Sequence, residues 1–272
     1  MIKKVLRYLL GFILFGIIIF SFYFNKMLLF GVSVFFIIIA MAEYRNMFKN
    51  KGIYPHKFIP ELWGAICAYV FIFSSDSMRQ IIIMPLIITG VILSFSITIL
   101  LNKKPYIETS FSSLAAILMI ICGLYIIKIT YYFDSDVSTI PVLIYFSAVL
   151  FSDFMASRIG PLYTRIKLSP EISPNKTLLG SIAHVTASCL VCCLFTFYIN
   201  IHLWQCILLG IILSVFSQLG DLTISMFKRN LGIKHSGSLF YDYGGILDRI
   251  DAFIFSAPAT YYFLCLISYI NQ

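Results

Sequence analysis

The stretch Ser225–Asp251 reads SMFKRNLGIKHSGSLFYDYGGILDRID and separates two long apolar runs. Basic residues commonly flank membrane helices on the cytoplasmic side, and such a flank accounts for the lysines and arginines of this stretch. It does not account for the acids. A charge near the bilayer core costs about 2.5–3.5 kcal/mol on insertion scales, so acids there are functional candidates. Asp221 closes the first apolar run, and Asp248 and Asp251 open the second. The stretch therefore predicts a charged site beside a membrane.

The spacing of these residues places them on two helix faces. If the end of the first run is helical, Asp221, Ser225 and Lys228 recur at i, i+4 and i+7 and share one face. Asp248 and Asp251 are three residues apart and share another. Two such helices could present carboxylates and cations to one cavity. This arrangement suits Mg²⁺ holding a polyphosphate, because Mg²⁺ takes few carboxylates and leaves positions for phosphate oxygens.

Composition gives the setting of this site. Hydrophobic residues make up 60% of the chain and charged residues only 12%, with a mean hydropathy of +0.93, which is typical of a polytopic membrane protein. We therefore expect an all-α fold with about nine transmembrane helices. The apolar segments fall at about residues 8–24, 27–42, 60–75, 80–101, 110–131, 138–156, 178–199, 203–224 and 251–270.

The distribution of basic residues predicts the orientation. With a cytoplasmic N-terminus, all but three of the 20 lysines and arginines fall on the inside; Lys26 and Arg79 fall outside and Lys128 within a span. This bias favours a cytoplasmic N-terminus and an odd number of spans. It predicts a multi-pass protein of the plasma membrane or cell inner membrane, with its charged loops in the cytoplasm. The net charge of +8 is thus a topology signal, and no nucleic-acid partner is expected.

A second charged stretch, Lys167–Thr177, reads KLSPEISPNKT and leads into the seventh apolar segment. As ordinary structure, its two prolines shape a loop and Lys176 flanks a helix. As a binding site, Ser173, Lys176 and Thr177 stand near the start of the next helix, where free backbone N–H groups favour a phosphate.

Several other residues are candidates for a functional role. The seven cysteines lie in apolar segments and are expected to be buried hydrophobic residues, since they show neither a disulfide framework nor zinc spacing. His184 is expected to be a hydrogen-bonded helix histidine, whereas His235 lies inside the first charged stretch. The pair Gly244 and Gly245 would let the backbone approach a ligand closely.

Together these stretches resemble the signature of the phosphatidate cytidylyltransferase family, also called CDP-diacylglycerol synthases. The matching residues are Ser225-Met-Phe-Lys228-Arg229, Lys234, Ser236-Gly237, Gly244-Gly245-Ile-Leu-Asp248-Arg249-Ile-Asp251, the lead-in Gln218-Leu-Gly220-Asp221-Leu222, and Lys167–Thr177 with Asp153 at the start of its block. The resemblance covers roughly the C-terminal 120 residues in order, and the first part of the chain resembles the family only in hydropathy. We therefore divide the chain into N-terminal helices (1–137, the first five spans) and a catalytic region (138–272) with cytoplasmic loops at 157–178 and 228–250.

The resemblance implies a reaction and a role for each residue. CMP would pass from CTP to phosphatidic acid, giving CDP-diacylglycerol and pyrophosphate in phospholipid biosynthesis. Asp221 and Asp248 would hold Mg²⁺, with Asp251 in support and with room for a second metal ion. The implied catalytic residues are Asp221, Asp248, Lys228, Arg229 and Arg249, and the implied substrate-binding residues are Ser173, Lys176, Thr177, Ser225, Lys234, Gly244 and Gly245. A homodimer is a further expectation.

The chain departs from the family pattern in five places. Lys234-His235 stands where Lys-Asp is usual, and Tyr241-Asp242-Tyr243 stands where Pro-Gly-His precedes the two glycines. Ile224 and Leu179 occupy positions where glutamate is common, and Ser157 replaces a tyrosine. His235 and Asp242 together would be an exchanged imidazole and acid.

Two other classes of function fit parts of the sequence. CTP-dependent polyprenol or dolichol kinases, and archaeal-type CDP-lipid synthases, share the use of CTP and a similar membrane fold, but the complete Ser225–Asp251 signature argues against them. A degenerate homologue, or a transporter with Asp153, Asp221 and Lys128 along an ion path, is the non-enzymatic alternative. Cations gathered at one membrane face, without an internal repeat, favour an enzyme that handles phosphates.

Overall fold

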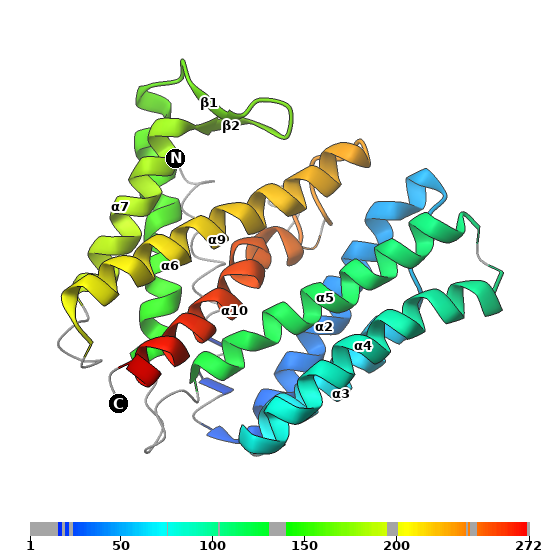
Figure 1. The fold of residues 1–272 in the computed structure, drawn as a ribbon. Coiled ribbons are helices and arrows are strands. Elements are labelled where there is room, and N and C mark those ends of the chain that lie inside the picture. Colours follow the sequence, from blue (N-terminus) through cyan, green and yellow to red (C-terminus); the bar gives the residue numbers. More distant parts are fainter. Residues whose placement is uncertain are drawn as a thin grey trace. The chain divides into compact units, whose positions relative to one another are not determined.

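The computed structural model describes residues 16–17, 20–21, 24–74, 76–102, 104–130, 140–194, 201–237, 239 and 244–270. Long helices make up most of this part of the chain (Figure 1). They are α2 (Lys26–Phe48), α3 (Ile59–Phe73), α4 (Asp76–Leu100), α5 (Tyr106–Thr130), α6 (Ile140–Ile159), α7 (Leu178–Leu194), α9 (Leu203–Asn230) and α10 (Leu247–Ile270). Two short 3-10 turns, η1 (Lys49–Lys51) and η2 (Gly160–Leu162), follow α2 and α6.

In the part of the chain that the structure describes, six stretches of helix are long and apolar enough to cross a membrane. They are Lys26–Phe48, Ile82–Leu100, Tyr106–Ile129, Ile140–Leu162, Leu203–Asn230 and Leu247–Ile270, whereas α3 and α7 are shorter apolar helices. Each predicted apolar segment from the second to the ninth coincides with a described helix. The first, 8–24, lies mostly outside the described residues, so the total of nine stays a prediction. The expected all-α membrane fold is confirmed.

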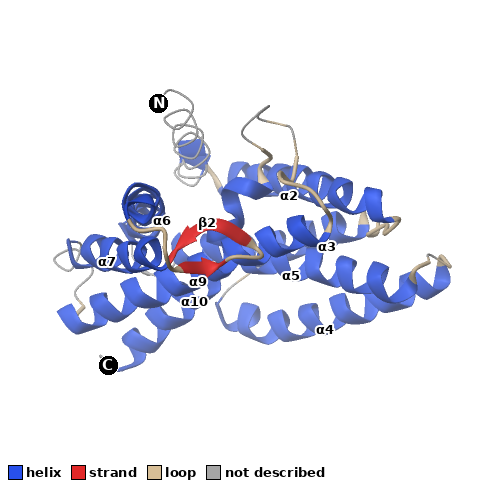
Figure 2. Ribbon diagram, turned by 90° about the horizontal axis from the view of Figure 1, so that it is seen from above, coloured by secondary structure: helices blue, strands red, loops and turns tan. Residues whose placement is uncertain are grey.

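Within the described residues, the second charged stretch departs from the all-helical fold by forming a small hairpin. Strand β1 (Lys167–Ser169) pairs antiparallel with β2 (Ser173–Thr177), with Lys167 opposite Thr177 and Ser169 opposite Ser173 (Figure 2). The sequence predicted a loop here. The strands are short, and Pro170 and Pro174 remove backbone donors, so the pattern of a strand pair is weak. The hairpin joins the end of η2 to the first residue of α7.

The chain forms two compact units. Unit 1 comprises the described residues of 125–229 and 250–272, and unit 2 comprises those of 17–124 and 230–249. Segments of the two units alternate along the chain, whereas the sequence predicted a single boundary after residue 137. Segment 230–249, which contains most of the signature after Arg229, belongs with the N-terminal helices.

Each unit is fixed by buried tyrosines as well as by apolar packing. In unit 1 the Tyr145 hydroxyl on α6 donates to the Phe253 carbonyl of α10 at 2.8 Å. In unit 2 the Tyr44 hydroxyl on α2 donates to the Ser112 carbonyl of α5 at 3.1 Å. A buried tyrosine needs such a partner for its hydroxyl, and each bond fixes two helices in register. The Gly64 position on α3 allows close packing, because a Cβ there would lie 2.9 Å from Ile120 of α5.

Candidate functional site

Asp221 lies at the centre of a charged cluster on α9. Its Oδ2 atom is 2.6 Å from Lys176 Nζ, and its Oδ1 atom accepts a hydrogen bond from the Ser225 hydroxyl at 3.2 Å. The contact with Ser225, one helical turn away, confirms the predicted shared face. Lys228, the third member of that face, is buried in the structure with 8% of its surface exposed.

The hairpin brings the second charged stretch to the same end of α9. Lys176 extends from β2 to Asp221, and Arg229 Nε donates to the Ile172 carbonyl in the hairpin turn at 3.1 Å. Ser173 is half-buried at the start of β2. Two stretches separated by about fifty residues of sequence thus meet in unit 1. Their meeting produces a cationic and polar surface around one carboxylate, which is the chemistry that a polyphosphate requires.

Thr177 anchors the hairpin to the helices on either side of it. Its buried hydroxyl donates to the Gly160 carbonyl at 2.9 Å and accepts from the Gly180 N–H at 3.1 Å. The second bond is an N-cap at the start of α7. A Cβ at Gly160 or Gly180 would lie 3.0 and 3.2 Å from this hydroxyl, respectively. The hydroxyl therefore fixes the backbone next to Lys176. A contact between the Thr177 hydroxyl and substrate stays a prediction.

Asp248 occupies the first turn of α10 in unit 2. Its Oδ2 atom accepts from the Ser236 N–H at 2.9 Å and the Gly245 N–H at 3.3 Å, and it lies 3.9 Å from His235 Nδ1. Gly244 has a φ of +86°, and a Cβ there would overlap this same oxygen. The first of the two glycines is thus explained by its backbone conformation and by the close approach of Asp248.

His235 departs from the family pattern and lies beside Asp248. Its side chain is 47% exposed. Tyr241, Asp242 and Tyr243 lie outside the described residues, so the exchange between His235 and Asp242 stays a prediction. Among the remaining predicted residues, Lys234 is exposed and Arg249 is half-buried.

Asp251 lies where α9 and α10 touch within unit 1. A Cβ on Gly220 would overlap the Asp251 carbonyl, so the two backbones are in close contact one residue before Asp221. The Asp251 side chain is buried and accepts from the Ala252 N–H at 2.8 Å. Asp221 belongs to unit 1 and Asp248 to unit 2, so the predicted convergence of these two carboxylates stays a prediction.

Glu43, a buried acid on α2, is not among the residues predicted from the sequence. Its carboxylate accepts from the backbone N–H groups of Ile246 and Leu247, at 2.9 and 3.0 Å, at the start of α10. The available signal was the one that selected Asp221: a single acid at the end of a long apolar run.

The donor chemistry of the acids fits Mg²⁺. Asp221 is 34% exposed and Asp248 9% exposed, and both offer carboxylate oxygens, the ligands that a hard cation prefers. Within the described ranges, no group of three or more His, Cys, Asp or Glu side chains could form a dedicated metal cage. Mg²⁺ does not need one, because it binds through one or two carboxylates together with substrate phosphates and water.

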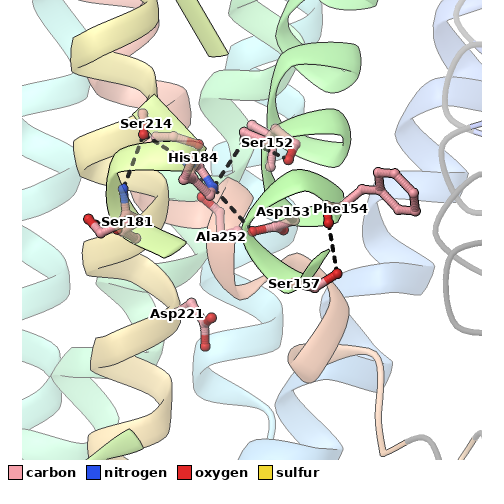
Figure 3. Close-up of polar contacts among 12 residues, drawn as sticks. Ser152, Asp153, Phe154, Ser157, Ser181, His184, Ser214, Asp221 and Ala252 are labelled. Atoms are coloured by element: carbon pink, nitrogen blue, oxygen red, sulfur yellow. Dashed lines mark hydrogen bonds and ion pairs between the residues drawn. The ribbon is translucent and has the colours of Figure 1, made fainter. Parts of the chain in front are cut away.

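A polar network lies farther along the helices of unit 1. His184 of α7 is buried; its Nδ1 atom is 2.7 Å from the Ser214 hydroxyl, and its Nε2 atom is 3.0 Å from Ser152 and 3.1 Å from Asp153 (Figure 3). Gln218 extends the network by donating to the Ser214 hydroxyl at 3.1 Å. The expectation of a hydrogen-bonded helix histidine is confirmed. Figure 3 also shows Asp221 apart from this network.

Replacing His184 by alanine should destabilise the protein. The substitution removes the partner of buried hydroxyls on α6 and α9, and a buried polar group left without its bond costs about 1–3 kcal/mol. We expect a lower Tm for detergent-purified His184→Ala, whereas His202→Ala, at an exposed position before α9, should keep the wild-type Tm. Equal Tm values for the two variants would show that the network does not hold the helices together.

Comparison with known proteins places these motifs in a family. Residues 5–267 match the cytidylyltransferase family. A phosphatidate cytidylyltransferase of Staphylococcus haemolyticus is 33% identical over 81% of this chain and 84% of its own length. One of Bacillus subtilis is 32% identical over 85% of this chain and 86% of its own length. One of Synechocystis is 43% identical over 45% of this chain and 42% of its own length. The match spans nearly all of the charged and apolar segments described above, and the chain belongs to the cytidylyltransferase family.

Proposed function

We propose that the protein transfers CMP from CTP to phosphatidic acid, giving CDP-diacylglycerol and pyrophosphate. The observation that carries this proposal is the meeting of the two charged stretches at Asp221, through Lys176, in a chain whose relatives are named phosphatidate cytidylyltransferase. The membrane fold supports a lipid acceptor, because the charged ends of apolar helices lie where a lipid phosphate meets water.

The reaction is an in-line displacement at the α-phosphorus of CTP. An oxygen of the phosphatidate phosphate forms the new P–O bond, and the bond from the α-phosphorus to the bridging oxygen breaks and releases pyrophosphate. Both reactants are anions, so the protein must align them and neutralise their charge. We assign charge neutralisation to four cations and hydrogen bonding to three hydroxyls: Lys176, Lys228, Arg229 and Arg249, and Ser173, Thr177 and Ser225. Lys234, Gly244 and Gly245 complete the proposed contacts with substrate.

We propose that the enzyme depends on Mg²⁺, with Asp221 and Asp248 as ligands and Asp251 in support. When bound, Mg²⁺ would neutralise negative charge on the CTP phosphates. The donor chemistry supports this set, because Mg²⁺ prefers carboxylate oxygens and binds through one or two carboxylates together with substrate phosphates.

An ion path through the spans receives less support from the structure. Its three proposed residues have separate partners: Asp221 with Lys176, Asp153 with His184, and Lys128 over the Tyr261 ring at 5.3 Å.

The position of the label in CTP tests the reaction class. Purified protein is given phosphatidate or a polyprenol together with CTP labelled at the α- or the γ-phosphate. We expect α-label in a lipid product, with phosphatidate as the acceptor. A γ-label in lipid, with polyprenol as the acceptor, would establish a kinase instead.

We further propose that both charged loops face the cytoplasm of the plasma membrane. The support is the charge bias of the sequence and the contact of the hairpin with the charged end of α9. Single cysteines placed in 160–176 and 230–246 of a cysteine-free variant should react with an impermeant maleimide only in inside-out vesicles. Labelling of the two loops from opposite faces would refute the topology and, with it, a shared site. The oligomeric state stays a prediction.

A further inference from the structure

The acid at position 43 is buried among apolar neighbours. Glu43 has 7% of its surface exposed, and Ala40, Tyr44 and Met47 on the same helix are buried around it. A carboxylate in such a place is costly unless hydrogen bonds satisfy it. The hydrogen bonds that Glu43 accepts must therefore offset the cost of burying its carboxylate.

Glu43 caps a helix that begins 204 residues later in the chain. Its Oε1 atom accepts from the Ile246 N–H at 2.9 Å and its Oε2 atom accepts from the Leu247 N–H at 3.0 Å, while the Ser236 hydroxyl lies 3.4 Å from Oε2. Leu247 is the first residue of α10, and the N–H groups at a helix start lack partners within the helix. A negative charge there is also favoured by the helix dipole. The cap usually supplied by a neighbouring residue comes here from α2.

Two glycines leave room for the Glu43 carboxylate beside the loop. A Cβ at Gly245 would overlap the Glu43 carboxylate, and one at Gly237 would lie 2.8 Å from Glu43 Cδ. Gly245 has no positive φ that would demand glycine. The lack of a side chain at Gly245 is therefore explained by the Glu43 carboxylate. From the sequence, this glycine was expected to make room for a ligand.

Glu43 and Asp248 hold the same two backbone segments. Glu43 contacts the Ser236 hydroxyl and the N–H groups just after Gly245, while Asp248 accepts from the N–H groups of Ser236 and Gly245 themselves. The two carboxylates enter from different helices. A shift of the loop away from Glu43 would therefore also move the donors that orient Asp248.

We propose that Glu43 is a positioning residue that fixes the start of α10 and thereby the carboxylate of Asp248. The proposal rests on the proposed function, because Asp248 is assigned there as a Mg²⁺ ligand. Side chains that orient a metal ligand typically change activity or metal affinity by about tenfold to a hundredfold when they are replaced. Glu43→Gln keeps the size of the side chain, removes its charge, and turns one acceptor into a donor facing an N–H group.

The test compares Glu43→Gln with Glu61→Gln in the full-length purified protein. Glu61 is a matched control, because it is a mostly buried acid of unit 2 that forms an ion pair with Arg45 and not with α10. We expect Glu43→Gln to lower kcat and to raise the Mg²⁺ concentration for half-maximal rate, each about tenfold or more. Glu61→Gln should keep both values. Equal effects of the two variants would overturn the proposal.

Hydrogen exchange of the peptide containing residues 244–250 gives a readout that needs no turnover. Exchange should be faster in Glu43→Gln than in the wild type and unchanged in Glu61→Gln. Unchanged exchange in Glu43→Gln would overturn the proposal even if activity fell. If the wild type transferred no CMP, the proposed function would fail, and the exchange result alone would decide whether Glu43 holds α10.

Glu43→Asp provides a second test in case Glu43→Gln does not fold. It keeps the charge but is one methylene shorter, so it should lose part of the rate and show the same rise in Mg²⁺ requirement. A Glu43→Asp protein with a lower Tm but wild-type kcat and Mg²⁺ requirement would show that Glu43 serves stability only.

Discussion

Asp248→Asn should lower the rate of CMP transfer by about 10²–10³, the loss typical of removing one strong electrostatic contact in a transition state. Asparagine has nearly the shape of aspartate, and its amide oxygen can still accept from the N–H groups of Ser236 and Gly245 that hold Asp248 Oδ2. The loop should therefore keep its structure while the charge available to Mg²⁺ is lost. Rates measured at saturating CTP and phosphatidate test this expectation.

The control for this prediction is Glu108→Gln, which removes one negative charge at an exposed position in the first turn of α5. It should leave turnover and Tm unchanged. If Asp248→Asn kept a rate within a few-fold of both the wild type and this control, Asp248 would not be part of the catalytic machinery.

Asp221→Asn should cause a loss of similar size, about 10²–10³ in rate, because the carboxylate next to Lys176 is the other proposed Mg²⁺ ligand. Its effect on stability should be small. Lys176 and Asp221 are both partly exposed, and ion pairs of this kind contribute about 0–1 kcal/mol. A large kinetic effect with a nearly constant Tm is the signature expected of a functional carboxylate.

A charge swap separates this role from a structural ion pair. The double variant Asp221→Lys with Lys176→Asp restores opposite charges at the same two positions. We expect it to remain as inactive as Asp221→Asn, because the carboxylate would then extend from the hairpin and not from α9. Recovery of activity by the swap would show that only the attraction between hairpin and helix matters.

Hydropathy and helical periodicity predicted most of the fold. Segments such as 203–224 and 251–270 carry long apolar runs, and these became α9 and α10 with extensions of a few residues at their charged ends. The contact between Asp221 and Ser225 also followed from spacing, because residues four apart in a helix are neighbours whatever the tertiary structure. These are local properties, and a single sequence contains them.

The contacts that the sequence did not predict are long-range. Strand pairing in Lys167–Thr177 was hidden by two prolines, although it is what brings Lys176 to Asp221. The bond from Glu43 to Leu247 joins residues 204 positions apart, and no periodicity along one helix can predict which distant helix start an acid will cap. For the same reason, the sequence suggested that Gly245 makes room for a ligand, whereas in the structure it makes room for the Glu43 carboxylate.

The most direct test of the central claim is the stoichiometry of the reaction. Purified protein in phosphatidate-containing micelles, given CTP and Mg²⁺, is assayed by mass spectrometry for CDP-diacylglycerol and enzymatically for pyrophosphate. We predict equimolar formation of both products, dependent on phosphatidate and lost in Asp248→Asn. CTP turnover that yields CDP and a phosphorylated lipid, or no CDP-diacylglycerol from the folded wild-type protein, would contradict the account.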